Sequence, residues 1–307
     1  MVKRILMVLL GAGWVMSCTF DYFVDEMNYQ VFVPGVQLGT VEDCRVLVYD
    51  EAGRLVKTRY AERPFDGDPR VVTGNFSFKL APGRYTVFCY TDAGGMPLAG
   101  IDQLETACLE SWRVEDAAGK ILFDDCTEDA YAEPLEVFSR KLSPEIGRAK
   151  GTRVDTAEME MYAGRITMRF KNFPGNASRV AFAQVVTRGV GTRQELSLDT
   201  LPSRFSEDDY LFIEKTAVQR ADNRTLEVDF RAFPSLEGSL ITSHVKFLDD
   251  DGSVISTIPV EMRDLHTNLP LRLLHGRRVI LEVESYTVVR VDIVGWDEDI
   301  SNSDREI

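Results

Sequence analysis

The sequence has few of the side chains that enzymes use for chemistry. Its 307 residues include only three histidines, His244, His266 and His275, and none of them belongs to an HExxH motif or an i, i+4 pair. The GxSxG elbow of serine hydrolases, the P-loop and the GxGxxG fingerprint are absent too. These absences disfavour zinc hydrolases, serine hydrolases and nucleotide-dependent enzymes. We therefore expect a protein that is not an enzyme and holds no metal or cofactor.

Positive charge is scarce as well. The 35 Lys and Arg side chains are outnumbered by 49 Asp and Glu, which gives a net charge of −14. Proteins that bind nucleic acid need clustered positive charge, and so do proteins that adhere electrostatically to anionic lipid. The composition therefore argues against both kinds of partner.

The sequence also lacks an apolar run long enough to cross a bilayer as a helix. Its best apolar run, Ile5–Val15, is short, follows two basic residues and leads to Ser17-Cys18. A charged start, a short apolar core and a small residue directly before cysteine are the pattern of a bacterial lipoprotein signal. We predict that residues 1–17 are a signal peptide and that Cys18 carries the lipid anchor at the outer membrane. The alternative is an ordinary secretory signal that ends near a cysteine.

Four further cysteines, at positions 44, 89, 108 and 126, show no CxxC or other metal-ligand spacing. An exported chain meets oxidising conditions, in which disulfides form. Cys44 and Cys89 both lie in strand-like runs and are a possible disulfide pair. Buried thiols that act as small hydrophobic side chains are an equal alternative.

Strand patterns dominate the chain. Four segments, 44–60, 75–91, 244–260 and 269–285, each have two β-rich runs joined by turn residues. Helical periodicity is weak, and the only helix candidates are two short segments, 101–111 and 206–215. Short strands with regular turn signals predict an all-β protein built from β-sandwiches.

A polar stretch near the middle of the chain predicts a domain boundary. Residues 141–154 contain one proline and two glycines, and a new strand pattern begins after them. We therefore expect two tandem domains, 18–150 and 151–307. Both have enough apolar residues to form a core.

The last predicted strand has two interpretations. Residues 286–296 are rich in β-branched side chains, and period two predicts that Val289, Val291 and Ile293 share one face. The strand could pair within its own sheet, which is the common outcome. It could instead be a donor strand offered to the open sheet edge of another molecule.

Several segments together resemble a known family. The lipoprotein signal is followed by CRVLVYDEAGRLV, then NFSFKLAPGRYTVFCYTDAGG, and then AEMEMYAGRITMRF at the start of the second domain. In this order they resemble the FimB/Mfa-like accessory and anchor subunits of type V fimbriae. The resemblance implies two tandem transthyretin-like β-sandwich domains in a lipid-anchored protein that is built into, or lies beneath, a fimbrial fibre.

The resemblance also bears on how the chain is processed. In shaft subunits of that class, a protease cuts after an arginine in the connection between the N-terminal strand and the rest of the chain. An anchor would instead keep its N-terminal strand and the lipid attached to it. Here no Lys or Arg lies between Cys18 and Arg45. We therefore expect residues 21–34 to stay attached and to complete a sheet of the first domain.

The favoured hypothesis is a structural lipoprotein that anchors or caps a fimbria, with fimbrial subunits as partners. The alternative is a surface lipoprotein that binds glycans through exposed aromatic side chains such as Trp112 or Trp296. A third possibility, calcium at Asp249–Gly252, is weak because these residues also form an ordinary hairpin turn.

Overall fold

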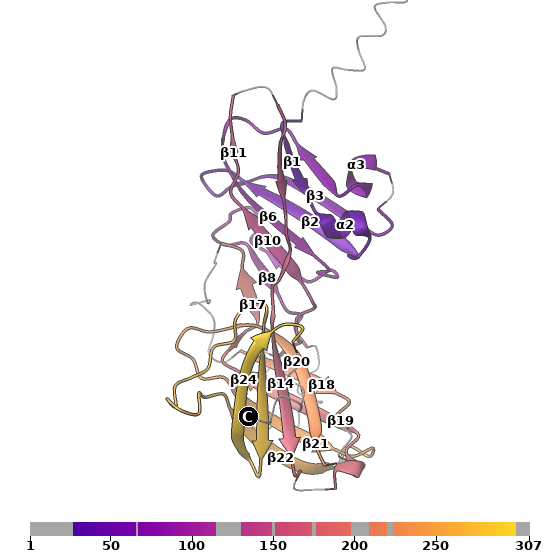
Figure 1. Cartoon of the computed structure of the whole chain (residues 1–307), viewed down its shortest axis with the longest axis vertical. Helices are drawn as coiled ribbons and strands as arrows, with labels where there is room; N and C mark the ends of the chain where they lie inside the picture. Colours follow the sequence, from indigo (N-terminus) through magenta and orange to yellow (C-terminus); the bar gives the residue numbers. More distant parts are fainter. Residues whose placement is uncertain are drawn as a thin grey trace, which may run out of the picture. The chain divides into compact units, whose positions relative to one another are not determined.

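The structure is a computed structural model of the chain. It describes residues 27–65, 67–114, 130–148, 151–173, 176–197, 209–219 and 224–298. Two of the cysteines, Cys18 and Cys126, lie outside these residues. The described residues are mostly β-strand, and the helices among them are the short α2 (Pro34–Leu38), α3 (Pro69–Val72) and a 3-10 turn, η1 (Ala177–Arg179) (Figure 1). The all-β prediction is confirmed.

The chain divides into two compact units that interleave along the sequence. The first is Met1–Cys89 with Arg140–Glu158, and the second is Tyr90–Ser139 with Met159–Ile307. This division differs from the two contiguous domains, 18–150 and 151–307, expected from the sequence. The physical reason is that short strands before residue 140 pair with later strands of the second unit, β8 with β17 and β9 with β18.

In the first unit, the N-terminal strand β1 (Tyr29–Phe32) is the centre of a three-stranded sheet. It runs parallel to β12 (Arg153–Thr156) and antiparallel to β4 (Asn75–Phe78). Two further short strands, β5 (Gly83–Arg84) and β11 (Glu145–Ile146), form a separate antiparallel sheet.

A five-stranded sheet has the order β13-β10-β6-β2-β3. The expected hairpin at 44–60 is confirmed, because β2 (Asp43–Tyr49) pairs with β3 (Leu55–Glu62). The remaining members are β6 (Thr86–Thr91), β10 (Phe138–Leu142) and β13 (Glu160–Met161). The hairpin expected at 75–91 is wrong, since β4 pairs with β1 while β6 belongs to this second sheet. The turn at Pro82-Gly83 carries the chain from one sheet to the other.

The second unit is a sandwich of two large sheets. One has the order β16-β20-β14-β23-β24, with β19 beside β20, and the other has the order β22-β21-β15-β18-β9. The strands of the first are β16 (Val190–Gly191), β20 (Leu226–Ser235), β14 (Gly164–Lys171), β23 (Arg277–Glu284), β24 (Thr287–Gly295) and β19 (Val218–Gln219). Those of the second are β22 (Val254–Glu261), β21 (Thr242–Leu248), β15 (Phe182–Arg188), β18 (Tyr210–Lys215) and β9 (Ala130–Tyr131). A small third sheet contains β17 (Arg193–Glu195), β8 (Cys108–Glu110) and β7 (Leu98–Ala99).

The core of this unit lies between the two large sheets. Alternate side chains of β14 and β23 point into it, including Ile166, Phe170 and Leu281, and they meet Val185 and Phe247 from the other sheet. Phe170 and Phe247 make an edge-to-face contact with ring centroids 4.9 Å apart. Inward apolar and outward polar residues thus alternate along β14, as the sequence pattern predicts for a sandwich.

Two helix expectations are wrong. Residues 101–111 form turns and β8. In the segment 206–215, residues 206–208 lie outside the described residues, and 210–215 form β18, a strand in the interior of its sheet. Residues 210–213, with the sequence YLFI, are buried on both faces of the sheet. A continuous apolar run of this kind has no period of two, so periodicity alone cannot tell it from a helix.

The last two expected hairpins had different outcomes. The one at 244–260 is confirmed as β21 and β22. The one at 269–285 is wrong, because β23 pairs with β14 on one side and with β24 on the other. Its antiparallel partner is therefore the following strand, reached through a turn at Ser285-Tyr286.

Candidate strand-docking site

The N-terminal strand is held tightly in the first unit. Tyr29 and Val31 are fully buried, and both neighbours of β1 pair with it along its whole length. The Asn28 side chain donates to the Leu80 carbonyl at 2.7 Å and accepts from the Leu80 amide at 2.9 Å. The expectation that segment 21–34 completes a first-domain sheet is thus confirmed for residues 29–32, whereas Pro34 begins α2 and residues 21–26 lie outside the described residues.

The last strand, β24, lies at an edge of the six-stranded sheet. It pairs antiparallel with β23 from Arg277–Gly295 to Glu284–Thr287, and among the described strands it has no second neighbour. The sequence left two interpretations of this strand open, pairing within its own sheet or donation to another molecule. The structure shows the first, because β24 pairs with β23. The opposite edge of β24 carries the backbone groups that another strand could pair with.

A β-bulge changes the face that this strand presents. Arg290 pairs with Glu282 but Val288 pairs with Val283, so Val289 is the extra residue of the bulge. Val288 and Val291 pack against the core, whereas Val289 is 45% exposed. The expectation that Val289, Val291 and Ile293 line one face is therefore wrong at Val289, because a bulge shifts the alternation by one residue.

Ile293 stays on the inward side of the sheet but remains open to solvent. It pairs with the buried Val279 of β23, yet its side chain is 51% exposed. Val289 and Ile293 thus give the free edge two exposed aliphatic side chains. Val291, which packs against the core, contributes to the stability of the strand itself.

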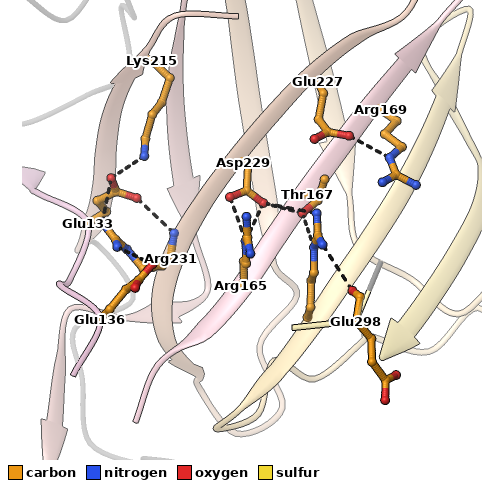
Figure 2. A network of polar contacts seen from close by, with 11 residues as sticks. Glu133, Glu136, Arg165, Thr167, Arg169, Lys215, Glu227, Asp229, Arg231 and Glu298 are labelled. Carbon is orange, nitrogen blue, oxygen red and sulfur yellow. Dashed lines mark hydrogen bonds and ion pairs between the residues drawn. The ribbon is translucent and has the colours of Figure 1, made fainter. Parts of the chain in front are cut away.

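A charged network covers the outward face of the same sheet (Figure 2). Asp229 on β20 accepts hydrogen bonds from Arg165 Nε, at 2.8 Å and 2.9 Å to its two oxygens, and from the Thr167 hydroxyl at 2.5 Å. The Arg278 guanidinium of β23 donates to Thr167 Oγ1 at 2.9 Å and lies 3.9 Å from Asp229. One carboxylate therefore ties together three neighbouring strands.

The residues after β24 join this network. Arg278 Nη1 donates to the Glu298 carbonyl at 3.2 Å, and the Arg165 guanidinium lies 5.9 Å from the centre of the Trp296 ring. The Glu298 carboxylate in turn accepts from the Gly295 amide at 3.1 Å. These contacts hold the end of β24 against its sheet, and Trp296 lies beside a guanidinium.

A second carboxylate fastens the segment before β10 to the second unit. Glu133 accepts from Lys215 Nζ at 2.5 Å and from the Arg231 amide at 3.1 Å, and its carboxylate lies 3.4 Å from the Arg231 guanidinium (Figure 2). Glu136 pairs with the same arginine at 3.2 Å. These pairs join the segment 130–137 to β18 and β20 of the same unit.

Cys44 and Cys89 lie on β2 and β6 as buried thiols, and no disulfide joins them. Of the two alternatives open from the sequence, the structure has the buried thiols. Burial raises the pKa of the Cys89 thiol to about 12. Because the thiolate is the reactive form, a thiol held protonated in this way is chemically quiet.

His275 and the acidic turn at Asp249 have structural contacts. His275 stacks on the Tyr162 ring at 4.9 Å, while Asp249 accepts from the Asp251 and Ser253 amides and pairs with Arg179. In the part of the chain that the structure describes, no three His, Cys, Asp or Glu side chains gather as a metal site. No helix among the described residues is long and apolar enough to cross a membrane.

No protein-family model and no curated protein matches the chain. Several solved structures are similar to it. A candidate adhesin from Bacteroides ovatus is 14% identical over 78% of this chain and 84% of its own, with a TM-score of 0.56. A candidate polysaccharide-binding protein from Bacteroides thetaiotaomicron is 13% identical over 91% and 99%, with a TM-score of 0.53. The fimbrial anchor protein Mfa2 from Porphyromonas gingivalis is 15% identical over 87% and 97%, with a TM-score of 0.51. At these identities the likeness establishes a shared fold, and it agrees with the sandwich fold that the sequence resemblance implied.

Proposed function

We propose that this chain is a non-enzymatic, lipid-anchored protein of the outer membrane that anchors or caps a fimbria. The likeness of its fold to a fimbrial anchor protein and to a candidate adhesin supports this role. The observation that carries the proposal is the placement of β1. It is an integral middle strand, and the chain leading to it from Cys18 offers no basic residue before Arg45.

The retained strand connects the lipid to the folded body. Pulling β1 out would break its pairing with both β4 and β12 and would expose Tyr29 and Val31. Each buried apolar side chain of this size contributes about 1.5–3 kcal/mol. A force on the fibre would then be transmitted through a folded sheet to the acyl chains on Cys18.

The contact with a neighbouring pilin is assigned to β24. Its free edge offers backbone hydrogen bonds, and Val289 and Ile293 offer exposed aliphatic side chains. Backbone pairing supplies affinity in such contacts, and side-chain pockets supply specificity. The strand keeps its own pairing with β23 while its outer edge meets the neighbour.

The test is co-purification of the full chain with fimbrial fibres. Val289→Asp with Ile293→Asp is expected to lower the amount of chain bound to fibres by about tenfold or more, because charges replace exposed aliphatic contacts. The matched control is Val254→Asp with Leu265→Asp, two side chains of the same unit with similar exposure, 48% and 49%. Equal loss in both variants would contradict a specific role for β24, and a wild-type chain that never accompanies fibres would contradict the proposed function.

Glycan binding is the second candidate. The likeness to a candidate polysaccharide-binding protein favours it, and Tyr60 and Tyr286 are 50% and 51% exposed. Aromatic faces of this kind suit stacking on sugar rings. Binding of the wild-type chain on a glycan array, lost in Tyr60→Ala or Tyr286→Ala, would favour this candidate over the fimbrial one.

A further inference from the structure

The first unit presents a second long edge strand, β3. It ends its sheet, pairs with β2 from Asp43–Glu62 to Tyr49–Leu55, and has no other neighbour among the described strands. Six of its eight residues are exposed, and Val56 and Tyr60 are 39% and 50% exposed. We call this row of backbone groups and exposed side chains the β3 edge.

Most of the other described sheet edges are protected against pairing. The strands β9, β13 and β16 have two residues each, and β4 and β12 have four each. The edge strand β22 carries Pro259, which has no backbone N–H to donate, and a bulge at Ile255. Shortness, proline and bulges are the usual devices that prevent pairing at an edge. The β3 edge is long and has no proline, and its bulge at Val56 lies near its start, so residues 57–62 remain as a regular run.

The β3 edge is protected against pairing with itself by charged side chains. These are mostly basic, whereas the chain as a whole is acidic. The segment from Arg54 to Arg63 contains four basic residues and one acidic residue, while the chain as a whole has a net charge of −14. Arg54 pairs with Asp50, and Arg63 with Glu42, at the two ends. Lys57 and Arg59 lie between them on the strand. Such charges repel a second β3 strand but attract a strand with carboxylates.

The side chains of β3 divide by face. Lys57 and Arg59 lie on the side of Val48 and Val46, with which they pair, and Tyr60, which pairs with Arg45, lies on the opposite side. Val56 is the extra residue of a bulge between Leu55 and Lys57. The Arg45 guanidinium stands 4.7 Å from the centre of the Tyr60 ring, and the Arg59 guanidinium stands 5.8 Å from that of Phe78. Cation–π contacts of this kind hold the exposed side chains in place.

We propose that the β3 edge accepts an extended segment of another subunit in which acidic and apolar residues alternate. Its carboxylates lie opposite Lys57 and Arg59, and its apolar side chains lie on the other face, beside Tyr60. Backbone hydrogen bonds along β3 join the two strands. This inference deepens the proposed function, on which it rests, by giving the chain a receiving edge in the first unit besides the contact at β24.

The test uses the full chain in detergent and two fluorescein-labelled peptides, TEVEYEVT and TKVKYKVT, with binding followed by fluorescence anisotropy. The wild-type chain is expected to bind the acidic peptide about tenfold more tightly than the basic one, from the two charge pairs. Lys57→Glu with Arg59→Glu is expected to reverse this preference. Arg272→Glu with Arg277→Glu, the same charge change at exposed residues of the second unit, is the control and is expected to leave it unchanged.

Folding of each variant is checked by circular dichroism and by the thermal midpoint. If the double reversal does not fold, Lys57→Gln with Arg59→Gln replaces it, and it is expected to abolish the preference between the peptides without reversing it. Equal binding of both peptides by the wild-type chain overturns the proposal, and so does a preference that survives these changes.

Two further outcomes distinguish the β3 inference from self-association of the chain and from the proposed function. A wild-type dimer in analytical ultracentrifugation that dissociates in the Lys57→Glu, Arg59→Glu variant assigns the edge to a second copy and overturns the proposal. The peptide assay does not involve fibres, so the two proposals fail separately. Lack of fibre co-purification contradicts the proposed function, and lack of peptide discrimination contradicts only the β3 inference.

Discussion

At the scale of single residues, Asp229 joins several polar side chains on the outward face of the second unit. Its carboxylate meets Arg165, Thr167 and Arg278, which come from the two strands β14 and β23 (Figure 2). The Arg278 side chain is only 7% exposed, so its charge depends on nearby acceptors. In the sequence these residues are simply the polar positions of strands in which polar and apolar residues alternate. The cross-strand register alone shows that they meet.

Replacing this carboxylate is expected to destabilise the second unit. Asp229→Ala removes the acceptor of Arg165 and Thr167 and leaves Arg278 with less compensation, at a cost of about 2 kcal/mol in the free energy of unfolding, since the pair is partly open to solvent. Urea denaturation followed by circular dichroism measures it. Asp250→Ala, at the exposed turn between β21 and β22, is the control and is expected to change stability by less than about 0.5 kcal/mol. A similar effect for both variants would contradict a special role for Asp229.

At the scale of secondary-structure elements, the β23–β24 hairpin has an unusual turn. Its two loop residues, Ser285 and Tyr286, have φ angles of 47° and 71°. Positive φ at both positions is the type I′ geometry, which favours Asn-Gly and is costly for a bulky side chain. The turn nevertheless places the Tyr286 ring 51% exposed at the tip of the edge hairpin. The sequence lacked the usual Asn-Gly signal, so this hairpin could not be predicted from turn residues.

Glycine at this position is expected to stabilise the hairpin. Tyr286→Gly removes the steric cost of the left-handed backbone and should raise the free energy of unfolding by about 1 kcal/mol. The reverse experiment is Gly252→Ala at the β21–β22 turn, where φ is 79° and an added Cβ meets no atom within 4 Å. It should lower stability by about 1 kcal/mol. Thermal unfolding of both variants measures these changes in stability. A loss of stability in Tyr286→Gly would show that contacts of the Tyr286 ring stabilise the protein by more than its left-handed backbone destabilises it.

At the scale of the whole molecule, the proposed tether and the charge of the body act in opposite directions. Without residues 1–17 the chain keeps 33 basic and 49 acidic side chains, a net charge of −16. A body of this charge is repelled by an anionic lipid surface. The proposed attachment to the membrane therefore depends on the acyl chains at Cys18 and not on charge.

Loss of that residue is expected to release the chain. Cys18→Ala should move the protein from the membrane fraction to the soluble fraction and should abolish incorporation of labelled palmitate. Ser17→Ala keeps a small residue before the cysteine and is the control, with both properties retained. The purified Cys18→Ala chain should also fail to sediment with vesicles that contain anionic lipid at about 0.15 M salt. Retention of Cys18→Ala in the membrane would contradict the lipid anchor.

Local chemistry was enough to predict part of this protein. Alternation along 164–171 and the Asp-Gly turn after residue 250 predict strands and a hairpin, because both depend on neighbouring residues only. The strand 210–215 was missed for the converse reason, since burial on both faces removes the alternation. The bulge at Val289 was missed because it depends on the register with β23.

The sequence by itself determined the all-β composition, the negative body, the pattern of a lipoprotein signal before Cys18 and the lack of basic residues between Cys18 and Arg45. Each is a property of composition or of residues close together in the chain. Only the tertiary structure decided that β4 pairs with β1 rather than with β6, that 90–139 belongs to the second unit, and that β24 and β3 are open edges. Strand pairing joins residues far apart in sequence, and its choice depends on which faces the whole fold can bury.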